Sequence, residues 1–147
     1  MLAMHVVMTV GKKTKGRKRH IVVDTMGNLL AVTVHAANTH DTKSGVHPAL
    51  QAYSAYPTIE GFCADAGYRG TFVDEINDFL EFRVDISERI CPEFVVVPIR
   101  WVVERTFSWM VHSRRLSKDY EIHTDSAEAM IRISHLRLLL RRLVKTS

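Results

Sequence analysis

The stretch that decides the fold reads Ile59-Glu60-Gly61-Phe62-Cys63-Ala64-Asp65-Ala66-Gly67-Tyr68-Arg69-Gly70. The apolar run 59–64 has the length of a buried strand, and the glycines after Asp65 predict a turn. Ligands of α/β folds bind at the carboxyl ends of strands, so Asp65 is the first candidate site residue. Its alternative interpretation is an ordinary turn or helix-capping aspartate, which position alone would favour.

The segments around this stretch predict an α/β domain with a mixed sheet. Upstream, residues 21–24 and 29–35 are predicted strands joined by a turn at 25–28, which makes an antiparallel hairpin. A helix is predicted over about 43–54. Downstream, the apolar spacing predicts a helix after Gly70, a strand at 82–86, an extended run at 94–97, a helix from about Arg100 and a last helix over about 124–145.

Length and composition indicate one globular domain. The chain has 147 residues, 46% of them hydrophobic, which is enough for a packed core. Its net charge of +4 permits a polyanionic partner without requiring one. The positions of the charged residues therefore decide whether such a partner is expected. Cys63 and Cys91 form no C-x-x-C pair and are expected to be reduced. We expect a cytoplasmic protein, because no apolar run has the length of a membrane span and the basic run follows the apolar start.

Glu104 is the second candidate acid. It lies on a predicted helix four residues after Arg100, and an exposed ion pair between the two is the simplest interpretation. The apolar neighbours Trp101, Val103 and Phe107 argue against a purely solvated carboxylate. Two carboxylates from different elements suit Mg²⁺, and paired metal ions cleave phosphodiesters, although such sites usually use at least three acids.

Two groups of basic residues are candidate DNA contacts. Six of the nine residues from 12 to 20 are Lys or Arg, and no acid lies among them. Phosphate contact is the favoured interpretation, and a solvated hairpin is the alternative. The first group comprises Lys12, Lys13, Lys15, Arg17, Lys18 and Arg19, and the second comprises Arg114, Arg115 and Lys118.

The last predicted helix carries an apolar face bordered by arginines. The apolar face consists of Met130, Ile133, Leu136, Leu140 and Leu143. The arginines either line a groove or keep the helix soluble, and they are Arg132, Arg137, Arg141 and Arg142.

Several ordered motifs together resemble the C-terminal catalytic region of bacterial insertion-sequence transposases of the DDE type, in the IS4-like and IS5-like group. The motifs are the basic segment 11–24, Asn38-Thr39-His40-Asp41, Ala64-Asp65-Ala66-Gly67-Tyr68-Arg69-Gly70, Arg100-Trp101-Val102-Val103-Glu104-Arg105-Thr106-Phe107-Ser108-Trp109 and residues 114–121. The resemblance covers residues 11–147, which would form an incomplete catalytic region after a non-matching segment, residues 1–10.

The resemblance implies a ribonuclease-H-like mixed sheet flanked by helices, and cutting and joining of DNA with Mg²⁺ or Mn²⁺. It places the second catalytic and metal-binding acid on Asp65, the last on Glu104, and a signature arginine on Arg100. It also implies insertion-sequence ends and target DNA as partners, and a homodimer or an N-terminal transposase half as a protein partner.

The chain departs from the family pattern at the first catalytic aspartate. That residue belongs to the first strand, upstream of the basic segment, where residues 1–10 contain no Asp or Glu. The first strand is therefore expected to be missing or replaced, with residues 4–10 able to fill part of its place. In the family pattern Asp24 closes the second strand, and Asp41 is expected to be a cap. Val97 and Val111 stand where the signature has tyrosine and lysine.

Three functions follow as hypotheses. The chain is an inert fragment of a decayed gene, or one half of a transposase completed by frameshifting or assembly, or a non-catalytic DNA-binding module that inhibits the parent enzyme. The nucleotide sequence upstream of Met1 separates the first two. DNA affinity that is indifferent to Mg²⁺ and to Glu104 would indicate the third.

Overall fold

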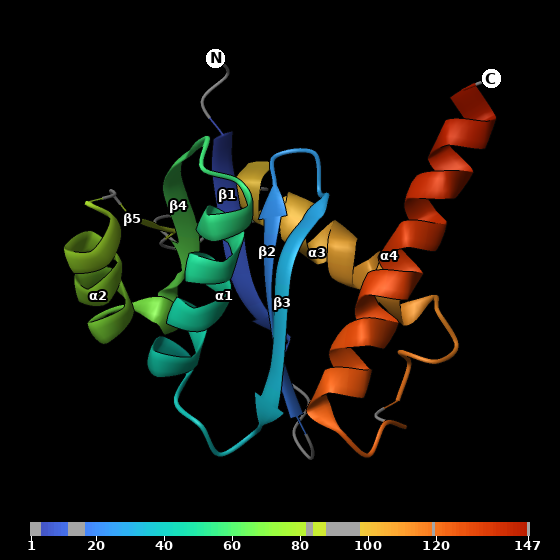
Figure 1. Cartoon of the computed structure of the whole chain (residues 1–147), viewed down its shortest axis with the longest axis horizontal. Coiled ribbons are helices and arrows are strands. Elements are labelled where there is room, and N and C mark those ends of the chain that lie inside the picture. The colour runs from blue at the N-terminus through green and yellow to red at the C-terminus, as the bar shows by residue number, and fades with distance from the viewer. Residues whose placement is uncertain (1–3, 12–16, 82–83, 88–97, 119, 147) are drawn as a thin grey trace, which may run out of the picture.

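The computed structural model describes residues 4–11, 17–81, 84–87, 98–118 and 120–146. Five strands form one sheet in the order β3-β2-β1-β4-β5 (Figure 1). β1 runs parallel to β4 and β4 parallel to β5, whereas β2 is antiparallel to β1 and β3, so the sheet is mixed as predicted. The strands are β1 (Met4–Gly11), β2 (Arg17–Asp24), β3 (Leu29–Ala36), β4 (Ile59–Asp65) and β5 (Val84–Ser87).

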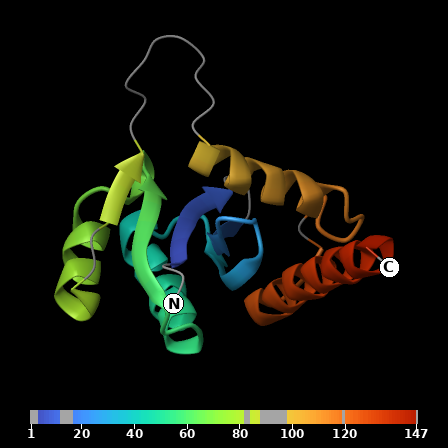
Figure 2. The same ribbon diagram turned by 90° about the horizontal axis from the view of Figure 1, so that it is seen from above.

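Helices cover both faces of the sheet (Figure 2). α1 (Asp41–Ala55) and α2 (Thr71–Leu80) pack on one face, and α3 (Pro98–Val111) and α4 (Thr124–Thr146) supply residues to the core of the other. Successive strand residues serve opposite faces: Val22 belongs to the first core, and its neighbours Ile21 and Val23 belong to the second. This alternation is the expected consequence of the two-residue period of a strand.

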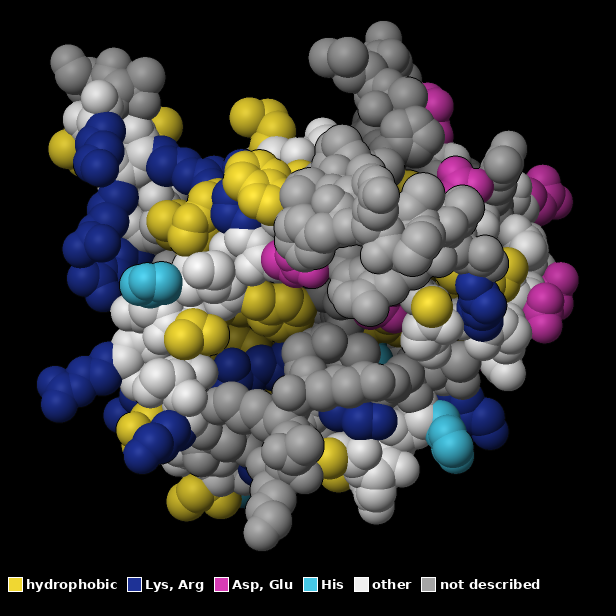
Figure 3. All heavy atoms as spheres, turned by 180° about the vertical axis from the view of Figure 1, so that it is seen from behind, with side chains coloured by type: hydrophobic (Ala, Val, Ile, Leu, Met, Phe, Trp, Pro, Cys, Tyr) yellow, Lys and Arg dark blue, Asp and Glu magenta, His cyan; other side chains and the backbone are white. Residues whose placement is uncertain are grey.

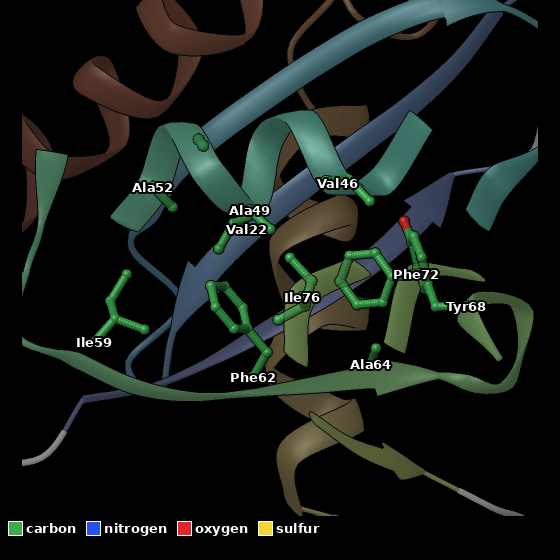
Figure 4. Packing of buried hydrophobic residues seen from close by; sticks show 11 residues of the cluster. Val22, Val46, Ala49, Ala52, Ile59, Phe62, Ala64, Tyr68, Phe72 and Ile76 are labelled. Atoms are coloured by element: carbon green, nitrogen blue, oxygen red, sulfur yellow. The ribbon is translucent and has the colours of Figure 1, made fainter. Parts of the chain in front are cut away.

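The core under α1 and α2 fixes the end of β4. Phe62 and Ala64 of β4 pack with Phe72 and Ile76 of α2, and Tyr68 closes this cluster (Figure 4). Gly45 of α1 allows the close approach, because a Cβ atom there would lie 2.3 Å from Cε1 of Tyr68. The cluster therefore anchors both sides of the turn that follows Asp65.

Most predicted elements are present. The predicted hairpin is confirmed, although β2 begins earlier than expected, at Arg17. The last strand begins at Val84, and residues 82–83 of the prediction lie outside the described part of the chain. α3 begins at Pro98 rather than Arg100, since proline fits the first position of a helix. The predicted extended run at 94–97 also falls outside the described residues.

Residues 4–11 occupy the place of the first strand. β1 lies in the middle of the sheet, between β2 and β4, and pairs with both along its length. Residues 4–11 therefore fill the central strand position of the sheet. The sequence of β1, Met-His-Val-Val-Met-Thr-Val-Gly, contains no acid.

The orientation of α4 differs from what its apolar face predicts. The buried residues of this helix are Ala127, Ile131 and His135. Of the predicted apolar face only Met130 packs against the core; the rest points to solvent, with exposed fractions of 56% for Ile133, 55% for Leu136, 53% for Leu140 and 66% for Leu143. On α3, Met110 is buried, whereas the next residue, Val111, is 61% exposed.

Among the described helices, none combines the length and the apolar character that crossing a membrane requires.

Candidate active site

Asp65 is the last residue of β4 and begins the turn that leads to α2. Its Oδ1 accepts a hydrogen bond from the backbone N–H of Gly67 at 2.8 Å, which caps the short 3-10 helix Ala66–Tyr68. The prediction that Asp65 caps a turn is thus confirmed. The same hydrogen bond holds the carboxylate at the strand end, where a ligand-binding acid would stand.

Asp65 lies on the face of the sheet that α3 covers. Ala64 packs in the core under α1 and α2, whereas Cys63 packs against the core that α3 and α4 complete. Because strand residues alternate between faces, Asp65 shares the side of Cys63. Asp65 and the helix that carries Glu104 are therefore on the same side of the sheet.

Glu104 is exposed, contrary to the expectation that apolar neighbours would enclose it. The buried residues of α3 are Val102, Thr106 and Met110, which form the face toward the sheet. A helical turn of 3.6 residues places Glu104 on the opposite face of α3. The sharing of one cation by Asp65 and Glu104 remains a prediction.

The described residues contain no group of three or more His, Cys, Asp and Glu that could hold a metal ion. Asp85 of β5 pairs in register with Cys63 of β4. Burial raises the pKa of the Cys63 thiol, and the negative charge of Asp85 raises it further. In β1, Val7 and Met8 stand beside Cys63 and Ala64, where the family pattern expects an acid on the neighbouring strand. The carboxylate oxygens of Asp65 and Glu104 suit a hard cation, but the described residues do not complete its ligand set.

Asp24 has a structural role, as expected. Its Oδ1 accepts hydrogen bonds from the backbone N–H groups of Met26 and Asn28, and its Oδ2 accepts one from the Asn28 side chain. The carboxylate thereby closes the turn between β2 and β3. Asp41 is not the cap of α1, since His40 occupies that position.

Arg105, rather than Arg100, is the arginine of α3 whose side chain has described contacts. Its guanidinium lies over the rings of Trp101 and Trp109, at 4.4 and 4.8 Å from their centroids, and donates to the carbonyl oxygen of Met26. The side chain of Arg100 lies outside the described residues. Trp101 is 47% exposed, so this apolar neighbour of Glu104 does not belong to the core.

The basic segment divides into two parts. Lys12, Lys13 and Lys15 lie outside the described residues. Arg17 donates to the carbonyl oxygens of Glu121 and Ile122, Lys18 to Thr39, and Arg19 to Leu116. These three side chains therefore tie the start of β2 to the connector before α4 and to the loop before α1.

In the second basic group, Arg114 and Lys118 are exposed. Arg115 pairs with Glu121 at 2.8 Å, and this hydrogen bond raises the pKa of its guanidinium. Because Glu121 also offers its carbonyl to Arg17, the connector joins both basic groups. Arg114, Arg115 and Lys118 are thus all exposed cations near this junction.

Two buried histidines play roles that sequence reasoning did not foresee. His20 is fully buried, its Nδ1 lies 2.5 Å from the Tyr68 hydroxyl, and its ring stacks on that of His35. His135 accepts a hydrogen bond through Nε2 from the backbone N–H of Leu29. No local pattern marks these residues, because their partners are 15 or more positions away in the sequence.

The strand order, the acid at the end of β4 and the helices on both faces define a ribonuclease-H-like domain. Solved structures with a similar fold support this assignment of the fold. The catalytic core of BIV integrase matches with a TM-score of 0.60 and 13% identity over 90% of this chain and 80% of that one. The catalytic core of HTLV-2 integrase, solved with magnesium, matches with a TM-score of 0.55 and 17% identity over 90% of this chain and 82% of that one. Such low identities establish the fold alone.

The chain belongs to the transposase DDE domain family, whose model matches residues 7–86. A Burkholderia cepacia protein assigned as a transposase for insertion sequence element IS402 is 29% identical over 130 residues, which cover 80% of this chain. The chain spans 60% of the length of that relative. The division of the chain at residue 10 stays a prediction.

Proposed function

We propose that this chain acts in DNA transposition as an incomplete DDE catalytic region, which binds insertion-sequence DNA but does not cut it unaided. The single observation that carries this proposal is a central strand without an acid. β1 occupies the central place beside β4, yet the first acid in the whole sequence is Asp24, which closes a turn. The strand that would present the first catalytic aspartate therefore presents none.

In this proposal Asp65 and Glu104 are the second and last acids of the family's metal-binding set, and Arg100 is its signature arginine. Mg²⁺ or Mn²⁺, when bound by a complete set, would activate the attacking oxygen and stabilise the leaving one. The two acids of this chain are oxygen ligands of the right kind. Losing one member of such a set commonly costs orders of magnitude in rate.

The DNA contacts in this proposal are electrostatic. Lys12, Lys13 and Lys15, with the exposed Arg114 and Lys118, would contact phosphates without reading sequence. Arg17, Lys18 and Arg19 would support this surface by holding the start of β2 to its neighbours.

A non-catalytic inhibitor of a full-length transposase is the second candidate. The same observation favours it, because an acid-free central strand preserves the fold and the basic surface while leaving the acid set short. An inhibitor would compete for the same DNA ends or assemble with the active enzyme.

Strand cleavage and DNA binding, measured on the same purified chain, test the proposal. We expect no nicking of insertion-sequence ends above the level of Glu104→Gln, in Mg²⁺ or Mn²⁺. We also expect DNA binding that neither Mg²⁺ nor Glu104→Gln changes. Metal-dependent nicking that Glu104→Gln abolishes would refute the incomplete site, and an absence of DNA binding would refute the DNA role. Inhibition of a full-length relative in the same assay would select the second candidate.

A further inference from the structure

Two side chains of α4 bind the backbone of an edge strand. β3 stands at the end of the strand order and pairs with β2 alone (Figure 1). Oε1 of Glu128 accepts the backbone N–H of Val34 at 2.9 Å, and Nε2 of His135 accepts that of Leu29 at 3.0 Å. These two N–H groups of β3 are therefore bound by a helix instead of by a neighbouring strand.

The two residues belong to a row with seven-residue spacing. Glu128, His135 and Arg142 follow one another at two helical turns, so they share one side of α4. Nη1 of Arg142 donates to Oδ1 of Asn28, at 3.5 Å, in the turn before β3. α4 thus runs along β3 in the opposite direction, with one polar contact for every two turns. These three residues are here called the polar row.

The edge that the polar row covers carries no charge or proline of its own. Residues 29–34 read Leu-Leu-Ala-Val-Thr-Val. Exposed edge strands usually carry a lysine, another charge or a proline, because uncovered N–H and C=O groups pair with strands of other chains. Uncharged segments of this length and composition are typical of strands that aggregate. β3 therefore depends on α4 for its cover.

The apolar hold of α4 on the sheet is small. Its buried apolar residues are Ala127 and Ile131, with Met130 packed beside them. From 136 to 145, a range that the structure describes in full, every residue is half-buried or exposed. Segments with few buried apolar contacts open locally, before the whole domain unfolds. The polar row therefore supplies much of the attachment of α4 to β3.

We propose that α4 is a latch over the β3 edge, and that acid opens this latch by protonating His135. Nε2 accepts the Leu29 N–H only while the imidazole is neutral, because both nitrogens of a protonated ring are donors. Protonation breaks this contact in the middle of the polar row. The freed backbone groups of β3 then become available for pairing with strands of other chains.

Positive charge on α4 favours this opening. Every charged residue from 129 to 147 is Lys or Arg, and Figure 3 shows such side chains gathered where the helix projects. Burial lowers the pKa of His135, and Arg142 lowers it further. Protonation therefore adds a charge to a segment that is already cationic.

The other elements packed around His135 present one acid. Asp24, in the turn between β2 and β3, raises the pKa of His135, but burial and Arg142 outweigh it. Residues 29–34 of β3 carry no charge, and α3 presents the cation Arg105, whose guanidinium contacts the same indole ring as that of Arg142. The pKa of His135 thus lies below its usual 6.5, and the proton binds more readily once the helix has moved away.

Native-state amide hydrogen exchange, resolved by NMR, tests the latch. Between about pH 7.5 and about pH 5.5 the equilibrium that exposes the Leu29 and Val34 amides should rise by up to about tenfold, because a histidine with a pKa of 6.5 is protonated in the open state first. This opening should depend little on low concentrations of urea, whereas exposure of the β1 and β4 amides should depend on urea strongly. Exchange of Leu29 and Val34 with the urea dependence of β1 and β4 would overturn the proposal.

His135→Gln is the matched variant, since its amide oxygen still accepts the Leu29 N–H but does not titrate. It should keep the protection of the Leu29 amide at about pH 7.5 and remove most of the loss at about pH 5.5. His123→Gln, at an exposed position just before α4, is the control and should behave as the wild type does. A loss in acid that survives His135→Gln would contradict the latch.

Aggregation gives a second readout, which depends on neither variant. At about pH 5.5 the wild-type chain should form aggregates that bind thioflavin T, faster than at about pH 7.5, with the amides of residues 29–34 protected inside them. Aggregates that leave these amides open to exchange would overturn the proposal, as would equal aggregation at the two pH values.

Discussion

At the scale of single residues, His135 links α4 to the hairpin and makes stability depend on pH. Its Nε2 accepts the backbone N–H of Leu29, which requires that nitrogen to be unprotonated. Burial, and secondarily the nearby Arg142, lowers the pKa of His135 below its usual 6.5, while Asp24 acts in the opposite direction. The folded protein therefore binds a proton at this residue only at lower pH than the unfolded chain does.

The sign of the resulting effect follows from linkage. Above pH 6.5 both states are neutral at His135, so the residue adds no pH dependence. As the pH falls below 6.5 the unfolded state gains a proton first, and the free energy of unfolding decreases until the lower pKa of the folded state is reached. Urea denaturation at a series of pH values should show this decrease.

His135→Gln should flatten that part of the pH profile, because glutamine offers an oxygen acceptor to Leu29 but does not titrate. His135→Phe should instead cost about 1–3 kcal/mol at about pH 8, since the Leu29 N–H is left without an acceptor. His123→Gln, at an exposed position, is the matched control. An unchanged profile in His135→Gln would remove this histidine as the source.

At the scale of elements, the basic segment is predicted to have two separable roles. Alanine at Lys12, Lys13 and Lys15 should lower the slope of log affinity for DNA against log salt, by roughly 0.9 for each phosphate that is no longer neutralised, with stability unchanged. Arg17→Ala should lower the free energy of unfolding by about 1 kcal/mol or more, because its guanidinium donates to two carbonyls of the connector. Fluorescence anisotropy and urea denaturation of both variants measure the two effects. A salt slope unchanged by the triple replacement would take this segment out of the DNA interface.

The strands and helices followed from the sequence wherever the signal was local. The turn at Gly27 and Asn28, the break after Asp65 and the apolar spacing of Phe72 and Ile76 each predicted an element that the structure contains. The orientation of α4 could not be predicted this way. Its longest apolar face is exposed, and the smaller face of Ala127 and Ile131 is buried, because contacts with β3 decide which side packs.

The site was only partly accessible to sequence reasoning for the same reason. Asp65 was located by its place after an apolar run, and the structure puts it at the end of β4. The contacts of Arg17, Arg19 and Glu128 reach partners about 100 residues away, and Glu128 accepts the backbone N–H of Val34 on β3. Such tertiary contacts leave no mark in local spacing.

At the scale of the whole molecule, the fold is complete while the proposed acid set is not. β1 pairs with β2 and β4 in the central position. In this chain the sheet therefore forms without an acid on its central strand. In the proposed function, the basic surface keeps a role in DNA binding in the absence of cleavage.

Titration with Mn²⁺, followed by electron paramagnetic resonance, tests the central claim most directly. The wild-type chain should show no saturable binding below about 1 mM, because the described residues contain no group of three such ligands around a cation site. Thr9→Asp, at the position after the Met8–Ala64 pair and hence beside Asp65, should create such binding, and Asp65→Asn should remove it again. Tight binding by the wild-type chain that Asp65→Asn abolishes, or no gain in Thr9→Asp, would contradict the account.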